Sequence, residues 1–316
     1  MKKIVVFGNI CIDLSIRTPY IPTNNEILKS NDFVISISGS GLNSTIAASK
    51  LGAEVDLIAC VGSDTFGEDS IRYLVNNEID TTHIRKVTDL PTGVELKIKV
   101  GEEIRTILYL GANEELNSDD LNAYILRHIT ANLVLLFSSP IKSEDILKAL
   151  KYGKRANMKI IFHLNDVIKM PDYAYENIDY LIIDKFTFTS LFKVDVEQIE
   201  DCIALFNSLN LKGLESLIII TDASILFFSK TKVQKFDSKV NDWKIYKDVF
   251  LGAFSYCIAN DKSTANAIIF SLHTAHYAGM REKKQFPSFD DVNCYLRGLV
   301  NNKLNPNIEV EKNLKI

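Results

Sequence analysis

The sequence predicts an α/β fold with a largely parallel sheet, and two features of its hydrophobic pattern support this. Short apolar runs alternate along the chain with amphipathic segments. Several runs are almost continuously apolar, as in Leu133–Phe137 and Leu217–Ile220, which is typical of strands buried on both faces of a parallel sheet. This alternation favours a Rossmann-like sheet flanked by helices with right-handed crossovers. The expected strands are Lys3–Gly8, Val55–Val61, Ala131–Ser138, Lys159–Leu164, Tyr180–Asp184, Ser216–Thr221 and Ser224–Ser229.

Amphipathic segments between the apolar runs predict the helices. The segment Leu42–Lys50 has apolar residues at helical spacing, and Gly52 follows it as a C-terminal signal. Thr65 and Glu68 have the spacing of a capping box, with an apolar face after them. The other expected helices are Ser143–Lys151, Val196–Leu209, Asp248–Asn260 and Ser263–Gly279.

One region departs from this alternation. Val94–Leu110 has period-two alternation on both sides of a turn that contains Gly101, which predicts a β-hairpin. Ile12–Ile27 shows a weaker alternation of the same kind. We expect the two pieces to form a small antiparallel sheet beside the core. Such a sheet would cover a site, form a dimer contact, or be an exposed hairpin of no special use.

Composition excludes several classes of protein. The 316 residues include 47% hydrophobic and 24% charged residues, with a net charge of −4, so the chain can bury a large core and lacks the basic patch that nucleic acids or anionic membranes attract. The five cysteines are scattered and form no C-x-x-C pair, which favours a reducing, cytoplasmic location over a disulfide framework. We find no apolar stretch of membrane-spanning length.

Polar residues after the first expected strand are the first site candidates, because ligands of open α/β sheets collect beyond the carboxyl ends of the strands. Asn9 and Asp13 are polar groups in an otherwise apolar stretch. A carboxylate at Asp13 would accept hydrogen bonds from substrate hydroxyls, or it would only stabilise a turn.

A glycine segment and a later aspartate are the other candidates. Gly39 and Gly41 permit close approach of backbone to a ligand, and Asn43 offers both a donor and an acceptor, although a plain turn has the same pattern. Neither G-x-x-x-x-G-K-[ST] nor G-x-G-x-x-G occurs, which disfavours a phosphate loop and a Rossmann dehydrogenase. Asp248 is expected at the start of a helix, either as a general base or as a simple N-terminal aspartate. His273 and His276 lack a third ligand nearby, so we expect no metal site.

The order of these segments resembles the ribokinase-like (PfkB) carbohydrate and nucleoside kinases over nearly the whole chain. The matching segments are the first strand through Asp13, Ser38-Gly-Ser-Gly-Leu-Asn43, Val61-Gly-Ser-Asp64-Thr-Phe-Gly67, Asp80–Ile84, Pro91-Thr-Gly93 and Gly111-Ala-Asn113. The resemblance implies a parallel α/β core at 1–13, 34–93 and 111–316, with a small β lid at 14–33 and 94–110. It also implies transfer of the ATP γ-phosphate to a hydroxyl of a sugar, nucleoside or related small molecule.

The same resemblance assigns roles to particular residues. Asp248 aligns with the family's catalytic base, and the family's sugar-binding positions fall at Asn9, Asp13, Gly39, Ser40, Gly41 and Asn43. The family's Gly-Ala-Gly before that aspartate, whose backbone N–H groups bind the transferring phosphate, is replaced by Ile245-Tyr246-Lys247. On the nucleotide side, Asp184-Lys-Phe-Thr187 lacks the expected glutamate and Thr221-Asp-Ala223 lacks the expected glycine.

These departures leave two hypotheses open. The first is an ATP-dependent carbohydrate kinase with reduced activity, in which Asp248 is the base, Mg²⁺ bridges the ATP phosphates, and backbone near Tyr246 and Lys247 forms an altered anion hole. The second is a catalytically inactive sugar- or nucleoside-binding homologue with a regulatory or interaction role. The resemblance also allows a monovalent cation near the anion hole and a homodimer formed through the β lid.

Overall fold

The computed structural model describes residues 2–30, 32–128, 132–138, 143–240, 242–281 and 286–303. Within them, the core sheet has the strand order β13-β12-β11-β10-β9-β8-β1-β4-β5. Strands β11, β10, β9, β8, β1, β4 and β5 run parallel to one another, and β12 and β13 extend the sheet antiparallel. They span β1 Ile4–Gly8, β4 Val55–Gly62, β5 Ile84–Val87, β8 Val134–Ser138, β9 Lys159–Leu164, β10 Tyr180–Asp184, β11 Ser216–Ile220, β12 Ser224–Ser229 and β13 Lys232–Asp237.

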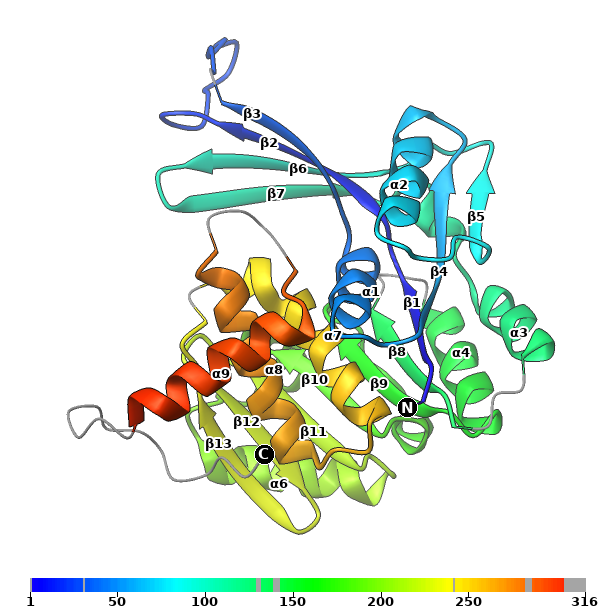
Figure 1. Cartoon of the computed structure of the whole chain (residues 1–316), viewed down its shortest axis with the longest axis vertical. Helices are drawn as coiled ribbons and strands as arrows, with labels where there is room; N and C mark the ends of the chain where they lie inside the picture. The colour runs from blue at the N-terminus through cyan, green and yellow to red at the C-terminus, as the bar shows by residue number, and fades with distance from the viewer. Residues whose placement is uncertain are drawn as a thin grey trace.

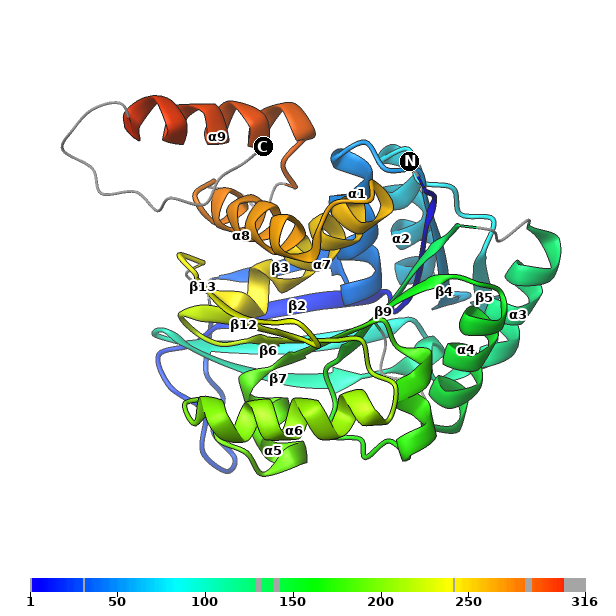
Figure 2. The same cartoon turned by 90° about the horizontal axis from the view of Figure 1, so that it is seen from below.

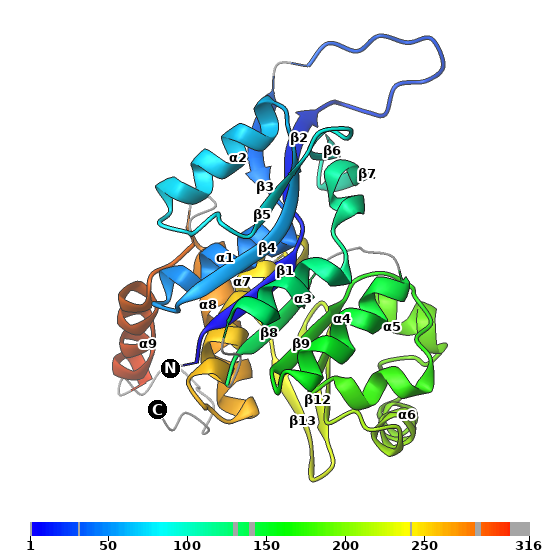
Figure 3. The ribbon, with the colours of Figure 1, turned by 90° about the vertical axis from the view of Figure 1, so that its right-hand side faces the viewer.

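Helices cover both faces of this sheet, as predicted. Alternate residues of β1 point to opposite faces: Val5 and Phe7 belong to one buried apolar cluster, and Ile4 and Val6 to the other. Figure 3 shows α1, α2, α7 and α8 on one side and α3 to α6 on the other, and Figure 2 shows α9 outside α8. The helices are α1 Ser40–Lys50, α2 Thr65–Asn76, α3 Ser118–Arg127, α4 Ser143–Arg155, α5 Lys185–Phe192, α6 Ile199–Leu211, α7 Trp243–Ala259, α8 Thr264–Gly279 and α9 Phe289–Lys303, with short 3-10 turns at η1 Gly111–Glu115 and η2 Asp172–Asn177.

A second, four-stranded sheet lies at one end of the core (top of Figure 1) in the order β3-β2-β6-β7. The expected hairpin forms, with β6 (Gly93–Val100) pairing antiparallel to β7 (Glu103–Tyr109). The expected partner strand is shorter than predicted: β2 covers Cys11–Arg17 and pairs with β3 (Phe33–Ser38). The central pair β2–β6 is parallel, so the expectation of an antiparallel sheet holds only for the outer pairs.

Local capping sets where the second helix begins. Asp64, and not Thr65, is the N-cap of α2, because its carboxylate accepts a hydrogen bond from Gly67 N at 2.8 Å. The same carboxylate accepts hydrogen bonds from the N–H and hydroxyl groups of Thr92 at 2.8 and 2.6 Å. These contacts tie the start of α2 to the loop that enters β6. In the part of the chain described, no helix is long and apolar enough to cross a bilayer.

Candidate active site

The candidate site lies along the carboxyl edge of the parallel strands, where open α/β sheets bind ligands. Five neighbouring strands place a polar group or a glycine at or near this edge. In sheet order they are Gly8 on β1, Ser138 on β8, His163 on β9, Asp184 on β10 and Thr221 just after β11.

Two glycines bring the start of α1 against the end of β1. Gly39 has a φ of 116°, a conformation that L side chains rarely adopt. A Cβ on Gly41 would lie 2.6 Å from the backbone of Gly8, so only glycine allows this approach. The backbone conformation therefore requires glycine at positions 39 and 41. The glycine segment in turn positions the polar side chains that follow on α1.

Asp248 on α7 meets those side chains. Ser40 Oγ donates a hydrogen bond to Asp248 Oδ1 at 2.6 Å, and Asn43 Nδ2 donates to Asp248 Oδ2 at 2.9 Å. Ser40 Oγ also lies 2.7 Å from the hydroxyl of Ser138. Three of the residues predicted for the site thus come together from distant parts of the sequence, and Ser138 is a fourth member that sequence analysis missed. Its apolar strand gave no signal beyond its position at the strand end.

The prediction that Asp248 starts a helix is wrong. The helix α7 begins at Trp243, five positions earlier, so Ile245, Tyr246 and Lys247 are helical. Tyr246 N donates to Asp242 O at 3.1 Å, and in an α-helix each later N–H donates to the carbonyl four residues before it. The N–H groups of Lys247 and Asp248 are therefore not free for an anion hole of the expected kind.

Packing explains why the helix starts early. Trp243 and Tyr246 pack against the buried cluster on this face, and the Trp243 ring lies 5.7 Å from that of Phe250 in an edge-on arrangement. The segment contains no glycine before Gly252 that would stop the helix. Burial of these aromatic rings thus favours a helix at the positions where the family has a glycine-rich turn.

Lys247 and Asp184 form an ion pair at this edge. Lys247 Nζ lies 3.7 Å from Asp184 Oδ2, and Asp184 Oδ1 accepts a hydrogen bond from Thr187 N at 2.8 Å as the N-cap of α5. Both carboxylate oxygens of Asp184 therefore have partners. The ion pair is long and partly exposed, so it contributes little to stability and can open.

The other predicted sugar-side residues have partners of their own. Asp13 accepts hydrogen bonds from Ser15 Oγ at 2.9 Å and from Lys97 Nζ. Burial acts to lower the pKa of Lys97, but the Glu95 and Asp13 carboxylates outweigh it and raise that pKa. Lys97 was not predicted as a site residue; its only sequence signal is the alternation of charged and apolar residues in β6.

Asn9 and Thr221 serve the backbone around them. Asn9 Oδ1 accepts a hydrogen bond from Gly41 N at 3.4 Å, which helps to hold the glycine segment. Thr221 Oγ1 accepts from Ser224 N at 3.0 Å and lies 2.8 Å from Ser224 O, closing the turn between β11 and β12. Among the described contacts, neither side chain reaches Asp248.

His163 is a buried polar group near the site. Its side chain is buried, Nδ1 lies 3.3 Å from Ser138 Oγ, and Nε2 has no hydrogen-bond partner among the described residues. Burial, with a smaller contribution from the charge of Lys247, holds its pKa well below the usual 6.5. The imidazole is therefore neutral in the folded protein at neutral and mildly acidic pH.

This histidine should make the protein less stable as the pH falls. In the unfolded chain His163 takes up a proton near pH 6.5, whereas in the folded chain it does not, so the unfolded state binds more protons below that pH. Its contribution to the free energy of unfolding should fall by up to about 1.4 kcal/mol per pH unit below pH 6. Urea unfolding at pH 5 to 7 measures this slope, and His163→Gln should have a smaller slope than the wild type. Equal slopes would contradict the assignment.

Comparisons with known proteins agree with this architecture. The family model described as pfkB family carbohydrate kinase matches residues 1–287. The ribokinase of Haemophilus influenzae is 26% identical over 280 residues, covering 85% of this chain and 89% of the relative. The deoxyribokinase of Salmonella typhi is 25% identical over 303 residues, covering 93% and 98%.

A solved structure shows the same fold. The Arabidopsis thaliana ribokinase, complexed with ribose and ATP, superposes with a TM-score of 0.81 at 18% identity, covering 94% of this chain and 99% of that one. The match of the family model extends over nine-tenths of the sequence, from the first strand through α8. The chain belongs to the pfkB family of carbohydrate kinases.

Proposed function

We propose that this protein transfers the γ-phosphate of ATP to a hydroxyl of a sugar or related small molecule, more slowly than a relative with an open glycine turn before its catalytic aspartate. One observation carries the proposal: the Asp248 carboxylate is held by Ser40 and Asn43, from the glycine segment, at the carboxyl edge of the sheet. The relatives named ribokinase and deoxyribokinase support a sugar as the acceptor.

Asp248 is the general base in this proposal. Each carboxylate oxygen accepts one hydrogen bond from Ser40 or Asn43 and retains a second lone pair for a substrate hydroxyl. The two donors fix the carboxylate in one orientation, so it can take the proton as the oxygen attacks phosphorus. Asp13, with Lys97 beside it, would hold another hydroxyl of the acceptor.

The described residues fit the phosphate donor only in part. Lys247 offers a positive charge beside Asp184, and the first turn of α7 offers the N–H groups of a helix N-terminus. Asp184 already has a partner on each oxygen, so Mg²⁺ would have to compete there with Lys247 and with the N–H group of Thr187. We therefore assign no protein ligand to Mg²⁺, which would be held by the phosphates of ATP and water.

A second candidate function is a sugar- or nucleoside-binding protein without phosphotransfer. The observation that favours it is the early start of α7 at Trp243, which uses the N–H groups of Lys247 and Asp248 inside the helix. The glycine segment and Asp13 are unaffected by this change. Such a protein would keep the acceptor pocket and act through regulation or a partner.

The two candidates are separated by measuring binding and turnover on the same acceptors. Thermal shifts with pentoses, hexoses and nucleosides identify the best ligand, and release of ADP from Mg·ATP is then followed with and without it. ADP release that depends on the acceptor, with the phosphorylated product seen by mass spectrometry, is the expected result. A clear thermal shift without any product would leave the binding protein as the function.

The lid is proposed as a contact between two copies of the chain. Its edge strands expose apolar side chains that a single copy leaves in water: Phe33, Val34, Ile35, Ile107, Leu108 and Tyr109. Sedimentation velocity should then show a dimer. Replacement of Val34 and Ile107 by serine should favour the monomer.

A further inference from the structure

A cluster of metal-binding side chains lies away from the candidate active site. It joins Asp56 on β4, His83 just before β5 and His128 at the C-terminal end of α3. One ligand atom from each residue lies within 4.8 Å of the other two. Asp56 is near the amino end of its strand, so this cluster is at the opposite edge of the sheet from Asp248.

The ring of His128 is oriented as a ligand would be. Its Nδ1 lies 2.9 Å from the backbone oxygen of Tyr124. A carbonyl oxygen only accepts hydrogen bonds, so Nδ1 carries the proton and Nε2 has the lone pair. Metal-binding histidines commonly donate their second ring N–H to a carbonyl or carboxylate in this way. Stacking on the Tyr124 ring, with centroids 4.1 Å apart, fixes the ring further.

One carboxylate oxygen of Asp56 accepts a hydrogen bond from Tyr124, and the other is available to a metal ion. The hydroxyl of Tyr124 donates to Asp56 Oδ2 at 2.8 Å, while no described residue hydrogen-bonds to Oδ1. A carboxylate oxygen only accepts hydrogen bonds, so the phenol carries the proton of this contact. Tyr124 is therefore a hydrogen-bond donor that orients the carboxylate.

His83 completes the set, with a ring nitrogen within 4.8 Å of the ligand atoms of Asp56 and His128. The His83 ring is 5.2 Å from that of His128, centroid to centroid, in an edge-on arrangement, and both side chains are partly exposed. They have room to turn toward a common centre.

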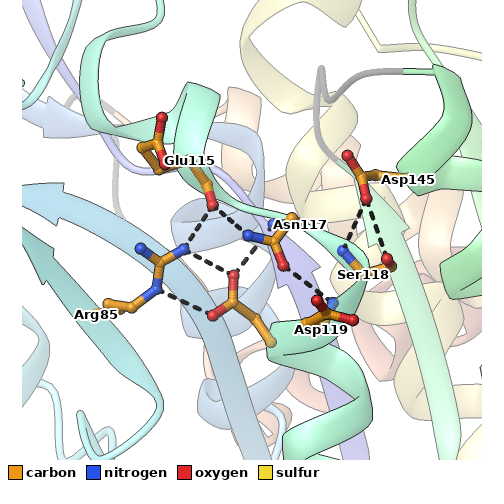
Figure 4. Close-up of polar contacts among 7 residues, drawn as sticks. Arg85, Glu115, Asn117, Ser118, Asp119 and Asp145 are labelled. Carbon is orange, nitrogen blue, oxygen red and sulfur yellow. Dashed lines mark hydrogen bonds and ion pairs between the residues drawn. The ribbon is translucent and has the colours of Figure 1, made fainter.

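A second set of contacts fixes α3 against β5 and so holds together the two backbone segments that carry the histidines. Figure 4 shows Arg85 beside Glu115 and Asn117, just before α3. The Arg85 guanidinium donates to both carboxylate oxygens of Asp120, at 3.0 and 2.9 Å. Asp120, Tyr124 and His128 are four residues apart, which places them on one face of the helix. Arg85 is two residues after His83, so this clamp links the elements that carry both rings.

Lys3 is the group that competes with a metal ion. Its Nζ lies 2.8 Å from Asp56 Oδ2 and 3.1 Å from Glu54 Oε1. Glu54 is largely exposed, so the ammonium can remain with Glu54 when a cation binds at Asp56. Replacement of this lysine by a neutral side chain should therefore strengthen metal binding.

We propose that Asp56, His83 and His128 bind a divalent transition-metal ion, with Zn²⁺ as the best match. Two imidazoles and one carboxylate are donors that Zn²⁺ accepts, and three protein ligands leave a fourth position for water. Tetrahedral ligands at about 2.0–2.1 Å from the metal are roughly 3.3–3.5 Å apart. The three side chains need to approach one another by up to about 1.4 Å, which rotation of the partly exposed His83 ring and a smaller shift of His128 supply. The bound ion would link β4, the start of β5 and α3.

Calorimetric titration of the metal-free full-length protein with ZnCl₂ tests the proposal. The wild type should bind about one equivalent at this site. His83→Gln and His128→Gln should each weaken binding by more than the 10–100-fold typical of changes to outer-shell partners, while Lys3→Met should strengthen it. The double variant His273→Gln/His276→Gln is the matched control, because it removes the chain's other closely spaced histidine pair. Cys294→Ser removes the exposed thiol as an alternative ligand.

The outcomes separate a built site from chance binding. Metal-free thermal unfolding shows whether each variant is folded, and Co²⁺ absorption of the wild type reports the ligand geometry. Loss of zinc binding only in the His83 and His128 variants supports the proposal. The proposal is overturned if the wild type does not bind zinc. It is also overturned if the control double variant or Cys294→Ser lowers the zinc affinity as much as the His83 and His128 variants do. Neither result depends on kinase activity, so failure here leaves the proposed function untouched.

Discussion

Asp248→Asn is expected to lower kcat for sugar phosphorylation by about 10²–10⁴, the usual contribution of a positioned general base. The amide has the shape of the carboxylate, but it takes no proton from the substrate hydroxyl. Its oxygen can still accept the hydrogen bond of Asn43, and its NH₂ group can donate to Ser40, so the local contacts survive in rearranged form. Acceptor binding, measured by calorimetry, should change little.

The control for this variant is Asp201→Asn, which makes the same chemical change on an exposed position of α6. It should retain wild-type turnover and the wild-type melting temperature. If Asp248→Asn also retained wild-type turnover, Asp248 would not be the base. If it lost acceptor binding together with activity, Asp248 would have a binding role that the proposal does not include.

The sequence predicted the core best where burial alone decides the structure. The continuous apolar runs at Leu133–Phe137 and Leu217–Ile220 fall on β8 and β11, because strands covered on both faces have no polar face. Three helices, α3, α5 and α9, were not predicted. Among them, α5 starts from an N-cap contact of Asp184 that the structure shows.

Site residues were predictable where the backbone conformation requires a particular residue type. Glycines occur at positions 39 and 41 because the chain needs a positive φ and a close backbone approach there. Ser138 and Lys97 had no such pattern, since their roles depend on which strands become neighbours. The start of α7 was predicted wrongly because the expected helix began at Asp248, an acidic residue of the kind that is favoured in a first turn. The aromatic packing of Trp243 and Tyr246, which extends the helix, is a tertiary effect.

Opening the first turns of α7 should have the opposite effect to Asp248→Asn. We expect replacement of Ile245-Tyr246-Lys247 by Gly-Ala-Gly to raise kcat by about 10²–10³, the typical value of one well-placed anion-hole donor. Each glycine costs a helix interior about 0.8–1 kcal/mol, so two of them favour a helix that begins near Asp248. The N–H groups before Asp248 would then be free to meet the phosphate. Steady-state kinetics with Mg·ATP and the best acceptor measure the change.

Two single variants identify which part of the replaced segment matters. Tyr246→Ala removes the ring that packs beside Gly279 on α8, and Lys247→Met removes the positive charge beside Asp184. If the helical segment obstructs phosphate, the triple replacement raises activity and Lys247→Met alone does not. A fall in activity with both Lys247→Met and the triple replacement would mean that Lys247 has taken over phosphate binding. The early start of α7 would then be an alternative phosphate site that uses a lysine in place of backbone N–H groups.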